Sequence, residues 1–123
     1  KCAIGYVGVY DVASFTSIGN IPNYRAGASY LSTVIPDDPE IRRAFSPSEQ
    51  ASKIKAAVFL IHGREDRQAH FRNYQIMTKK FDQIGKPYKG MVKDGEGHGF
   101  YDRENKYELA REIVTFLNEH IGS

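Results

Sequence analysis

The segment AAVFLIHGRED, residues 56–66, places six consecutive apolar residues directly ahead of a polar turn. An uninterrupted apolar run of this length is typical of a strand covered on both faces, as in parallel sheets. The run at residues 2–9 has the same character apart from one tyrosine hydroxyl. KPYKGMVK, residues 86–93, predicts a weaker strand whose lysines suit a sheet edge. Three strands are therefore expected.

Helical segments are expected before and after the strand at residues 56–61. Ser46, Pro47 and Glu49 in SPSEQASKI predict a capping box that opens a short helix leading into this strand. From residue 71 to 84 apolar residues recur every three or four positions, which predicts a helix that Gly85 and Pro87 end.

A last helix is expected to start at Asn105, with Glu108 reaching back to cap it. Its apolar positions are Tyr107, Ala110, Ile113, Val114, Leu117 and Ile121. The element order is thus strand, long crossover over residues 11–45, strand, helix, strand, helix. This order predicts an α/β fold: a parallel sheet of about three strands with flanking helices, within one domain spanning residues 1–123.

Composition limits the classes of partner. Apolar residues make up 41% of the 123 residues, charged residues 26%, and the net charge is +2 with both signs mixed along the chain. These values indicate a globular domain and argue against a nucleic-acid or membrane partner. The apolar runs are too short to span a bilayer. Because the single cysteine, Cys2, cannot form an internal disulfide, cysteine usage does not distinguish a cytoplasmic from a periplasmic or secreted location.

Two residues with complementary chemistry follow neighbouring predicted strands. Asp66 comes after the strand at 56–61, and His98 lies in DGEGHGFYD, residues 94–102, after the strand at 86–93. Loops at the carboxyl ends of parallel strands gather on one sheet edge, so these side chains can meet although 32 positions separate them. A carboxylate that accepts Nδ1–H of an imidazole fixes the tautomer of a general base. The order Asp then His is the second half of the Ser, Asp, His order of α/β-hydrolases.

Two segments of the sequence resemble the prolyl oligopeptidase family of serine peptidases, especially its dipeptidyl-peptidase and acylaminoacyl-peptidase-like branches. The similar segments are KIKAAVFLIHGRED, residues 53–66, and the region from Gly85 to Gly122, which includes the GxGHGF pattern. The resemblance implies that the chain is the C-terminal part of an α/β-hydrolase catalytic domain, with Asp66 as triad acid and His98 as triad base. It also implies oligopeptide substrates and no cofactor. RQAH at residues 67–70 departs from the Val or Pro that often follows the acid in relatives.

The triad nucleophile has no counterpart here. A serine elbow needs G-x-S-x-G, and none of the serines, at positions 14, 17, 29, 32, 46, 48, 52 and 123, has that context. The resemblance places the elbow ahead of residues 2–9, so we expect a partial domain that is inactive alone. Its first strand would then expose an edge, which predicts self-association through that edge.

The remaining polar candidates have simpler explanations. His62 is expected to be a structural hydrogen-bonding residue, His70 to face solvent, and His120 to lie near a helix C-terminus. No HExxH spacing occurs, so no metal site is expected. Asp94 and Glu96 are expected to be solvated loop acids.

Two weaker candidates lie in the long crossover. Asp11 is a candidate pocket or hydrogen-bonding residue, and NYRAGASYLSTVIP, residues 23–36, lines a specificity pocket or serves packing. Three alternative functions stay open: an ester or lactone hydrolase of the same fold, a complete non-catalytic interaction domain, and a flavodoxin-like domain. The last is disfavoured because no phosphate-cradling loop appears.

Overall fold

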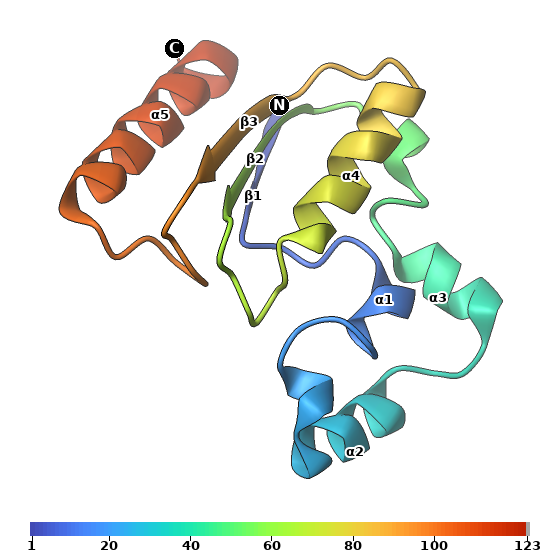
Figure 1. The fold of residues 1–123 in the computed structure, drawn as a ribbon. Helices are drawn as coiled ribbons and strands as arrows, with labels where there is room; N and C mark the ends of the chain where they lie inside the picture. Colours follow the sequence, from blue (N-terminus) through green and yellow to red (C-terminus); the bar gives the residue numbers. More distant parts are fainter. Residues whose placement is uncertain (123) are drawn as a thin grey trace.

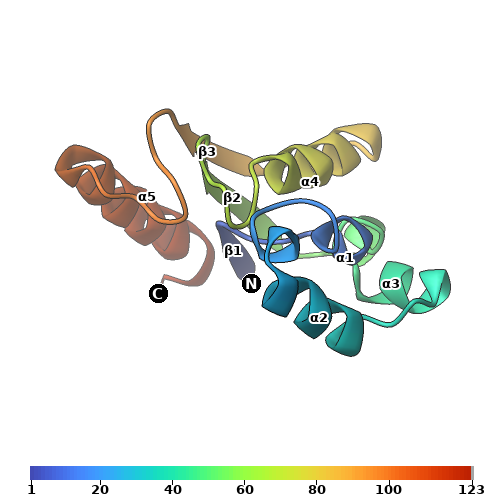
Figure 2. The same cartoon turned by 60° about the horizontal axis from the view of Figure 1, so that its bottom comes forward.

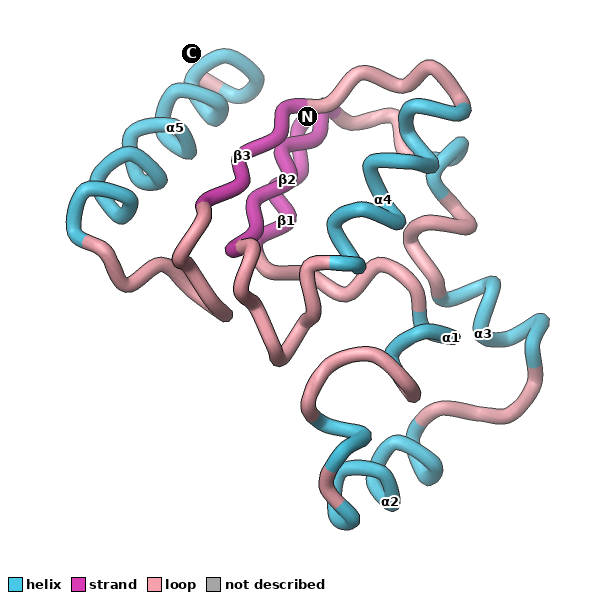
Figure 3. The backbone as a smooth tube through the Cα atoms, in the orientation of Figure 1, coloured by secondary structure: helices cyan, strands magenta, loops and turns pink. Residues whose placement is uncertain are grey.

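The computed structural model describes residues 1–122 and shows a parallel sheet in the order β1-β2-β3 (Figure 1, Figure 3). The strands are β1 (Cys2–Tyr6), β2 (Ala57–Gly63) and β3 (Lys89–Lys93). The helices are α1 (Val12–Phe15), α2 (Arg25–Val34), α3 (Pro39–Phe45), α4 (Arg72–Gln83) and α5 (Arg103–Ile121), with 3₁₀ turns η1 (Ile21–Asn23) and η2 (Ala51–Lys53). The predicted three strands and the α/β class are confirmed.

The central strand β2 is covered on both faces, as its unbroken apolar sequence predicts. Val58 and Leu60 pack on the side of α4, whereas Phe59 and Ile61 pack on the side of α5. Figures 1 and 2 show α4 and α5 on opposite sides of the sheet. The alternation follows from the two-residue period of a strand, which sends successive side chains to opposite faces.

Only some of the apolar positions expected along helix α5 face the sheet. Ile113 and Phe116 pack against β2 and β3 residues, but Tyr107, Val114 and Ile121 are exposed. The start of the helix is also earlier than predicted. Asp102 is the N-cap and accepts hydrogen bonds from the backbone N–H groups of residues 104 and 105, so the expected cap at Asn105 is wrong.

The predicted capping box at Ser46 is wrong as well. Ser46 follows the last residue of α3, and its hydroxyl donates to the carbonyl of Arg42 (2.7 Å) and accepts from Val12 N–H (2.9 Å). Those partners occupy the oxygen that would cap a new helix. Residues 47–50 therefore form turns that lead into η2, and Glu49 pairs instead with Lys80 on α4.

Strand β1 ends three residues before the predicted end of its apolar run. Val7 has a φ of 49°, in the left-handed region that a β-branched residue rarely adopts. Its N–H still donates to the carbonyl of Ile61 (2.9 Å), so the chain leaves the sheet directly after this bond.

Helices α1 to α3 lie beyond the carboxyl ends of the strands (Figure 1). Asp11 caps α1 by accepting a hydrogen bond from Ala13 N–H, which confirms its expected hydrogen-bonding role. In the predicted tyrosine-rich segment, Leu31 and Ile35 are buried but Tyr24 and Tyr30 are exposed. No helix within residues 1–122 is long and apolar enough to cross a membrane.

Candidate functional site

Two loops meet at the carboxyl edge of the sheet. The β2 loop, residues 64–71, carries Asp66, and the β3 loop, residues 94–102, carries His98. Their main chains join through the N–H of Glu65, which donates to the carbonyl of Glu96 (3.0 Å). Neighbouring parallel strands thus bring the two predicted residues to one edge.

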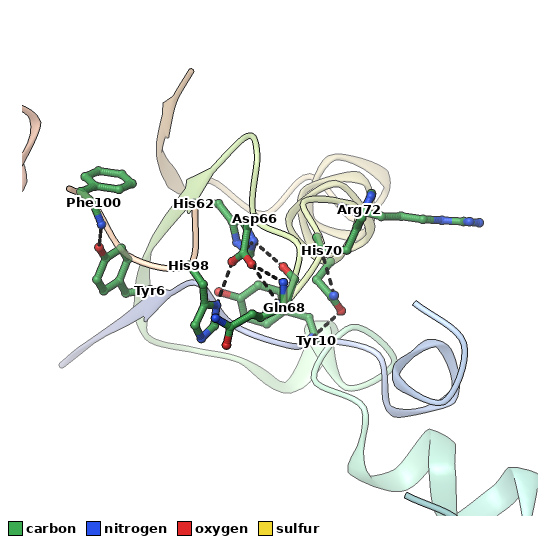
Figure 4. Close-up of polar contacts among 11 residues, drawn as sticks. Tyr6, Tyr10, His62, Asp66, Gln68, His70, Arg72, His98 and Phe100 are labelled. Carbon is green, nitrogen blue, oxygen red and sulfur yellow. Dashed lines mark hydrogen bonds and ion pairs between the residues drawn. The ribbon is translucent and has the colours of Figure 1, made fainter. Parts of the chain in front are cut away.

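Both carboxylate oxygens of Asp66 are engaged, and the residue is only 2% exposed. Oδ1 accepts hydrogen bonds from the backbone N–H groups of Gln68 (2.9 Å) and Ala69 (3.0 Å). Oδ2 lies 2.9 Å from Nδ1 of His98. The loop's own backbone therefore fixes the carboxylate so that one oxygen faces the imidazole (Figure 4).

A second imidazole, that of His62, lies against the same carboxylate. Its Nε2 is 2.7 Å from the carbonyl of Ala69 and 3.3 Å from Oδ2 of Asp66. Because a carbonyl only accepts hydrogen bonds, Nε2 carries the proton. Burial lowers the pKa of His62 below its ordinary 6.5, which keeps the ring neutral. His62 is a buried structural residue, as its sequence position predicts, and it also supports Asp66.

His98 occupies the apex of a three-residue turn. The N–H of Gly99 donates to the carbonyl of Gly97 (2.9 Å), and Gly99 has a φ of 118°, which favours glycine. Gly97 has no such constraint, because a Cβ there would meet only ordinary contacts. The His98 side chain is 35% exposed, and none of the hydrogen bonds found in residues 1–122 reaches its Nε2.

Close approach of the two loops depends on Gly63, at the end of β2. A Cβ at this position would lie 2.3 Å from the carbonyl oxygen of Glu96 and 2.4 Å from that of Gly97. Neither distance is sterically possible, so only glycine lets the β3 loop lie this close to the strand that carries Asp66. The close approach of the two loops therefore rests on Gly63 and not on Gly97, which faces no such contact.

Glu96 is not the solvated acid that its sequence context suggests, since it is 2% exposed. Its Oε2 accepts from Tyr101 N–H (2.6 Å), and its Oε1 accepts from Asp102 N–H (3.1 Å) and Asn105 Nδ2 (2.7 Å). Burial raises the pKa of Glu96, but these hydrogen bonds outweigh it and leave the pKa below its ordinary value. The sequence offers no signal for this role, because the donors lie five to nine positions away.

The other polar candidates lie outside this contact. Asp94 is exposed and pairs with Arg64 across the two loops. His70 is exposed and accepts from Arg72 N–H, and His120 lies in the last turn of α5. Within residues 1–122 no group of three or more His, Cys, Asp or Glu side chains is placed to hold a metal ion.

The Asp66–His98 pair has a defined chemistry. A carboxylate only accepts hydrogen bonds, so the imidazole proton is on Nδ1 and the lone pair is on Nε2. Nε2 takes part in none of the hydrogen bonds found in residues 1–122, and the side chain is partly exposed. Such an imidazole can accept a proton from a group brought to Nε2, and Asp66 stabilises the imidazolium that forms.

The sequence matches the prolyl oligopeptidase family over residues 1–123. The chain belongs to the prolyl oligopeptidase family. Over 79 residues it is 28% identical to the uncharacterized peptidase YtmA of Bacillus subtilis, a match that covers 64% of this chain and 30% of that protein.

Solved peptidase structures share the fold of this family member. A puromycin-hydrolyzing peptidase of Mycobacterium tuberculosis matches with a TM-score of 0.85 and 21% identity, over 99% of this chain and 18% of that one. The acylaminoacyl peptidase of Pyrococcus horikoshii matches with a TM-score of 0.80 and 21% identity, over 98% of this chain and 20% of that one. The chain therefore spans less than a third of the length of each of these relatives. Its sheet and helices correspond to part of an α/β-hydrolase fold.

Proposed function

We propose that residues 1–123 supply the acid–base half of a serine peptidase active site, with His98 as general base and Asp66 as the residue that orients it. One observation carries the proposal: Nδ1 of His98 lies 2.9 Å from a buried carboxylate, and Nε2 is left unbonded among the described residues. Membership of a peptidase family supports it.

The reaction follows from this arrangement. A serine hydroxyl attacks the acyl carbonyl while Nε2 of His98 takes the hydroxyl proton, and Asp66 stabilises the resulting imidazolium. The imidazolium then donates that proton to the leaving amine. The acyl group is now held as an ester of the serine. Water attacks this ester and loses a proton to Nε2; the ester bond breaks, and the imidazolium returns the proton to the serine oxygen as the acid leaves.

The nucleophile is proposed to come from outside residues 1–123. No serine of this sequence stands in a G-x-S-x-G elbow, the strained turn that exposes a hydrolase nucleophile. The 123-residue chain alone should therefore turn over no substrate. Oligopeptides are the proposed substrates, since structural neighbours include an acylaminoacyl peptidase in complex with Z-Gly-Gly-Phe-chloromethyl ketone.

The test uses the complete reading frame that encodes this chain, assayed on aminoacyl p-nitroanilides and on matched esters. His98→Ala and Asp66→Asn should each lower kcat/KM by about 10⁴-fold. Two exposed residues outside the contact serve as controls: His70→Ala and Asp94→Asn should stay within about twofold of the parent. Undiminished hydrolysis by His98→Ala would overturn the proposal, and turnover of esters without anilides would favour the ester hydrolase.

A further inference from the structure

Glu96 holds a buried charge that the proposed reaction does not use. Its three hydrogen-bond partners are all neutral N–H donors, and within residues 1–122 no Lys, Arg or His side chain lies within ion-pair distance of it. A buried carboxylate without a counter-ion is costly, so its retention calls for a physical reason.

Helix capping does not supply that reason. The N-cap of α5 is Asp102, which already accepts the N–H groups of Glu104 (2.9 Å) and Asn105 (3.0 Å). Glu96 instead binds the N–H groups of Tyr101 and Asp102, which precede the helix. Its side chain thus closes residues 96–101 into a ring, and His98 lies within that ring.

The ring is tied to its surroundings at both ends, to the β2 loop at one and to strand β1 at the other. At one end, the carbonyl of Glu96 accepts from Glu65 N–H beside Asp66. At the other end, Phe100 N–H donates to the hydroxyl of Tyr6 at the end of β1 (2.7 Å), and the two aromatic rings pack edge to face (Figure 4). His98 is the central residue between these ties.

We propose that ionised Glu96 is a positioning residue of the active site, which closes the β3 loop into a ring and thereby holds the His98 imidazole against Asp66. The inference rests on the proposed function for its catalytic meaning. The negative charge of Glu96 is essential to this role, because all three of its hydrogen-bond partners are donors and charge-assisted hydrogen bonds are stronger than neutral ones. Glutamine would turn an NH₂ group toward at least one of those donors.

The experiment compares Glu96→Gln with Glu65→Gln, the same chemical change at an exposed neighbour on the same sheet edge. The readout is the downfield NMR resonance of the His98 Nδ1 proton in the 123-residue chain, recorded well below the unfolding temperature. Glu96→Gln should lose this resonance through exchange with solvent and speed amide exchange at Tyr101 and Asp102. Glu65→Gln should leave both unchanged. Glu96→Gln with a native His98 resonance would overturn the proposal, even if its unfolding temperature fell, because that result shows a purely structural role.

Asn105→Ala keeps the inference falsifiable if Glu96→Gln does not fold, since it removes one donor and leaves the charge. It should broaden the His98 resonance, and an unchanged resonance would contradict the proposal. In the complete reading frame, Glu96→Gln should lower kcat about 100-fold with KM little changed. If His98→Ala left hydrolysis intact, the proposed peptidase role would fail, yet the NMR comparison would still decide whether Glu96 positions His98.

Discussion

The imidazole of His98 and the carboxylate of Asp66 approach to 2.9 Å although the residues are 32 positions apart. The contact depends on two parallel strands in adjacent positions, each ending in a loop on the same edge. Asp66 is held by the backbone N–H groups of Gln68 and Ala69 and by His62, whereas His98 is held by the ring that Glu96 closes. Different structural devices therefore fix the two halves of the contact.

Replacing Gly63 should separate the loops. Gly63→Ala puts a methyl group within 2.3 Å of the Glu96 carbonyl oxygen, so the β3 loop must move away and the Glu65–Glu96 backbone bond must stretch. We expect a loss of about 1–3 kcal/mol in the free energy of unfolding, the usual cost of overpacking, together with loss of the His98 Nδ1 proton resonance. Urea unfolding and NMR measure the two effects.

Gly97→Ala is the matched control, because a Cβ there meets Tyr101 only at 3.8 Å and the backbone is not left-handed. It should match the parent or be slightly more stable. Equal stability of Gly63→Ala and the parent would show that the loops do not need this close approach.

His62 should make the fold sensitive to mild acid. Burial lowers the pKa of His62, so below about pH 6.5 the unfolded chain binds a proton that the folded chain does not. Unfolding then takes up a proton, and the free energy of unfolding should decrease as pH falls from 7 toward 5, with a limiting slope of about 1.4 kcal/mol per pH unit. Chemical denaturation at several pH values measures this slope.

His62→Gln should be less stable at pH 7 but show a shallower dependence between pH 7 and 5. His70→Gln, at an exposed position, should keep the parent slope. If the slope were the same in His62→Gln and the parent, His62 would not be the responsible group.

How far the sequence predicts the fold depends on whether each signal is local. The unbroken run at residues 56–61 indicates a strand buried on both faces, and the structure confirms it. The capping box at Ser46 fails because the hydroxyl is bound by Val12, 34 residues earlier in the chain, a partner that no local pattern reveals. The buried face of α5 is not set by a local signal either: Phe116 and Tyr107 are both aromatic, and only packing decides which one is buried.

The candidate site likewise has residues that the sequence predicts and residues that only long-range contacts reveal. Asp66 and His98 could be paired from topology and from the chemistry of their side chains. The role of Glu96 could not be predicted, since an acid between two glycines gives no sign that backbone N–H groups five and six residues later will donate to its carboxylate. The requirement for glycine at position 63 could not be predicted either, because it arises from a steric contact with residue 96, 33 positions later in the chain.

The outer edge of β1 should mediate self-association of the 123-residue chain. Within residues 1–122 this edge pairs with no strand, whereas the outer strand β3 carries Lys89 and Lys93, which pair with Glu112 and Glu108. An unprotected edge is prone to strand pairing with another copy. We expect sedimentation that depends on concentration in the micromolar range, and Ala3→Lys should reduce it.

Gln75→Lys adds the same charge at an exposed position on α4 and should not change association. A monomer at all micromolar concentrations would refute association through this edge.

The most direct test of the central claim is the tautomer of His98, measured by ¹⁵N chemical shifts in the 123-residue chain at about pH 8. We expect a proton on Nδ1 and none on Nε2 in the parent chain, because Oδ2 of Asp66 can only accept a hydrogen bond. In Asp66→Asn, the N–H groups of Gln68 and Ala69 should retain the amide oxygen at the Oδ1 position. The NH₂ group then faces Nδ1 and donates to it, so Nδ1 must be unprotonated and the imidazole proton should move to Nε2. A proton on Nε2 in the parent chain, or the same tautomer in both chains, would contradict the assignment of Asp66 as the residue that prepares His98 to act as a base.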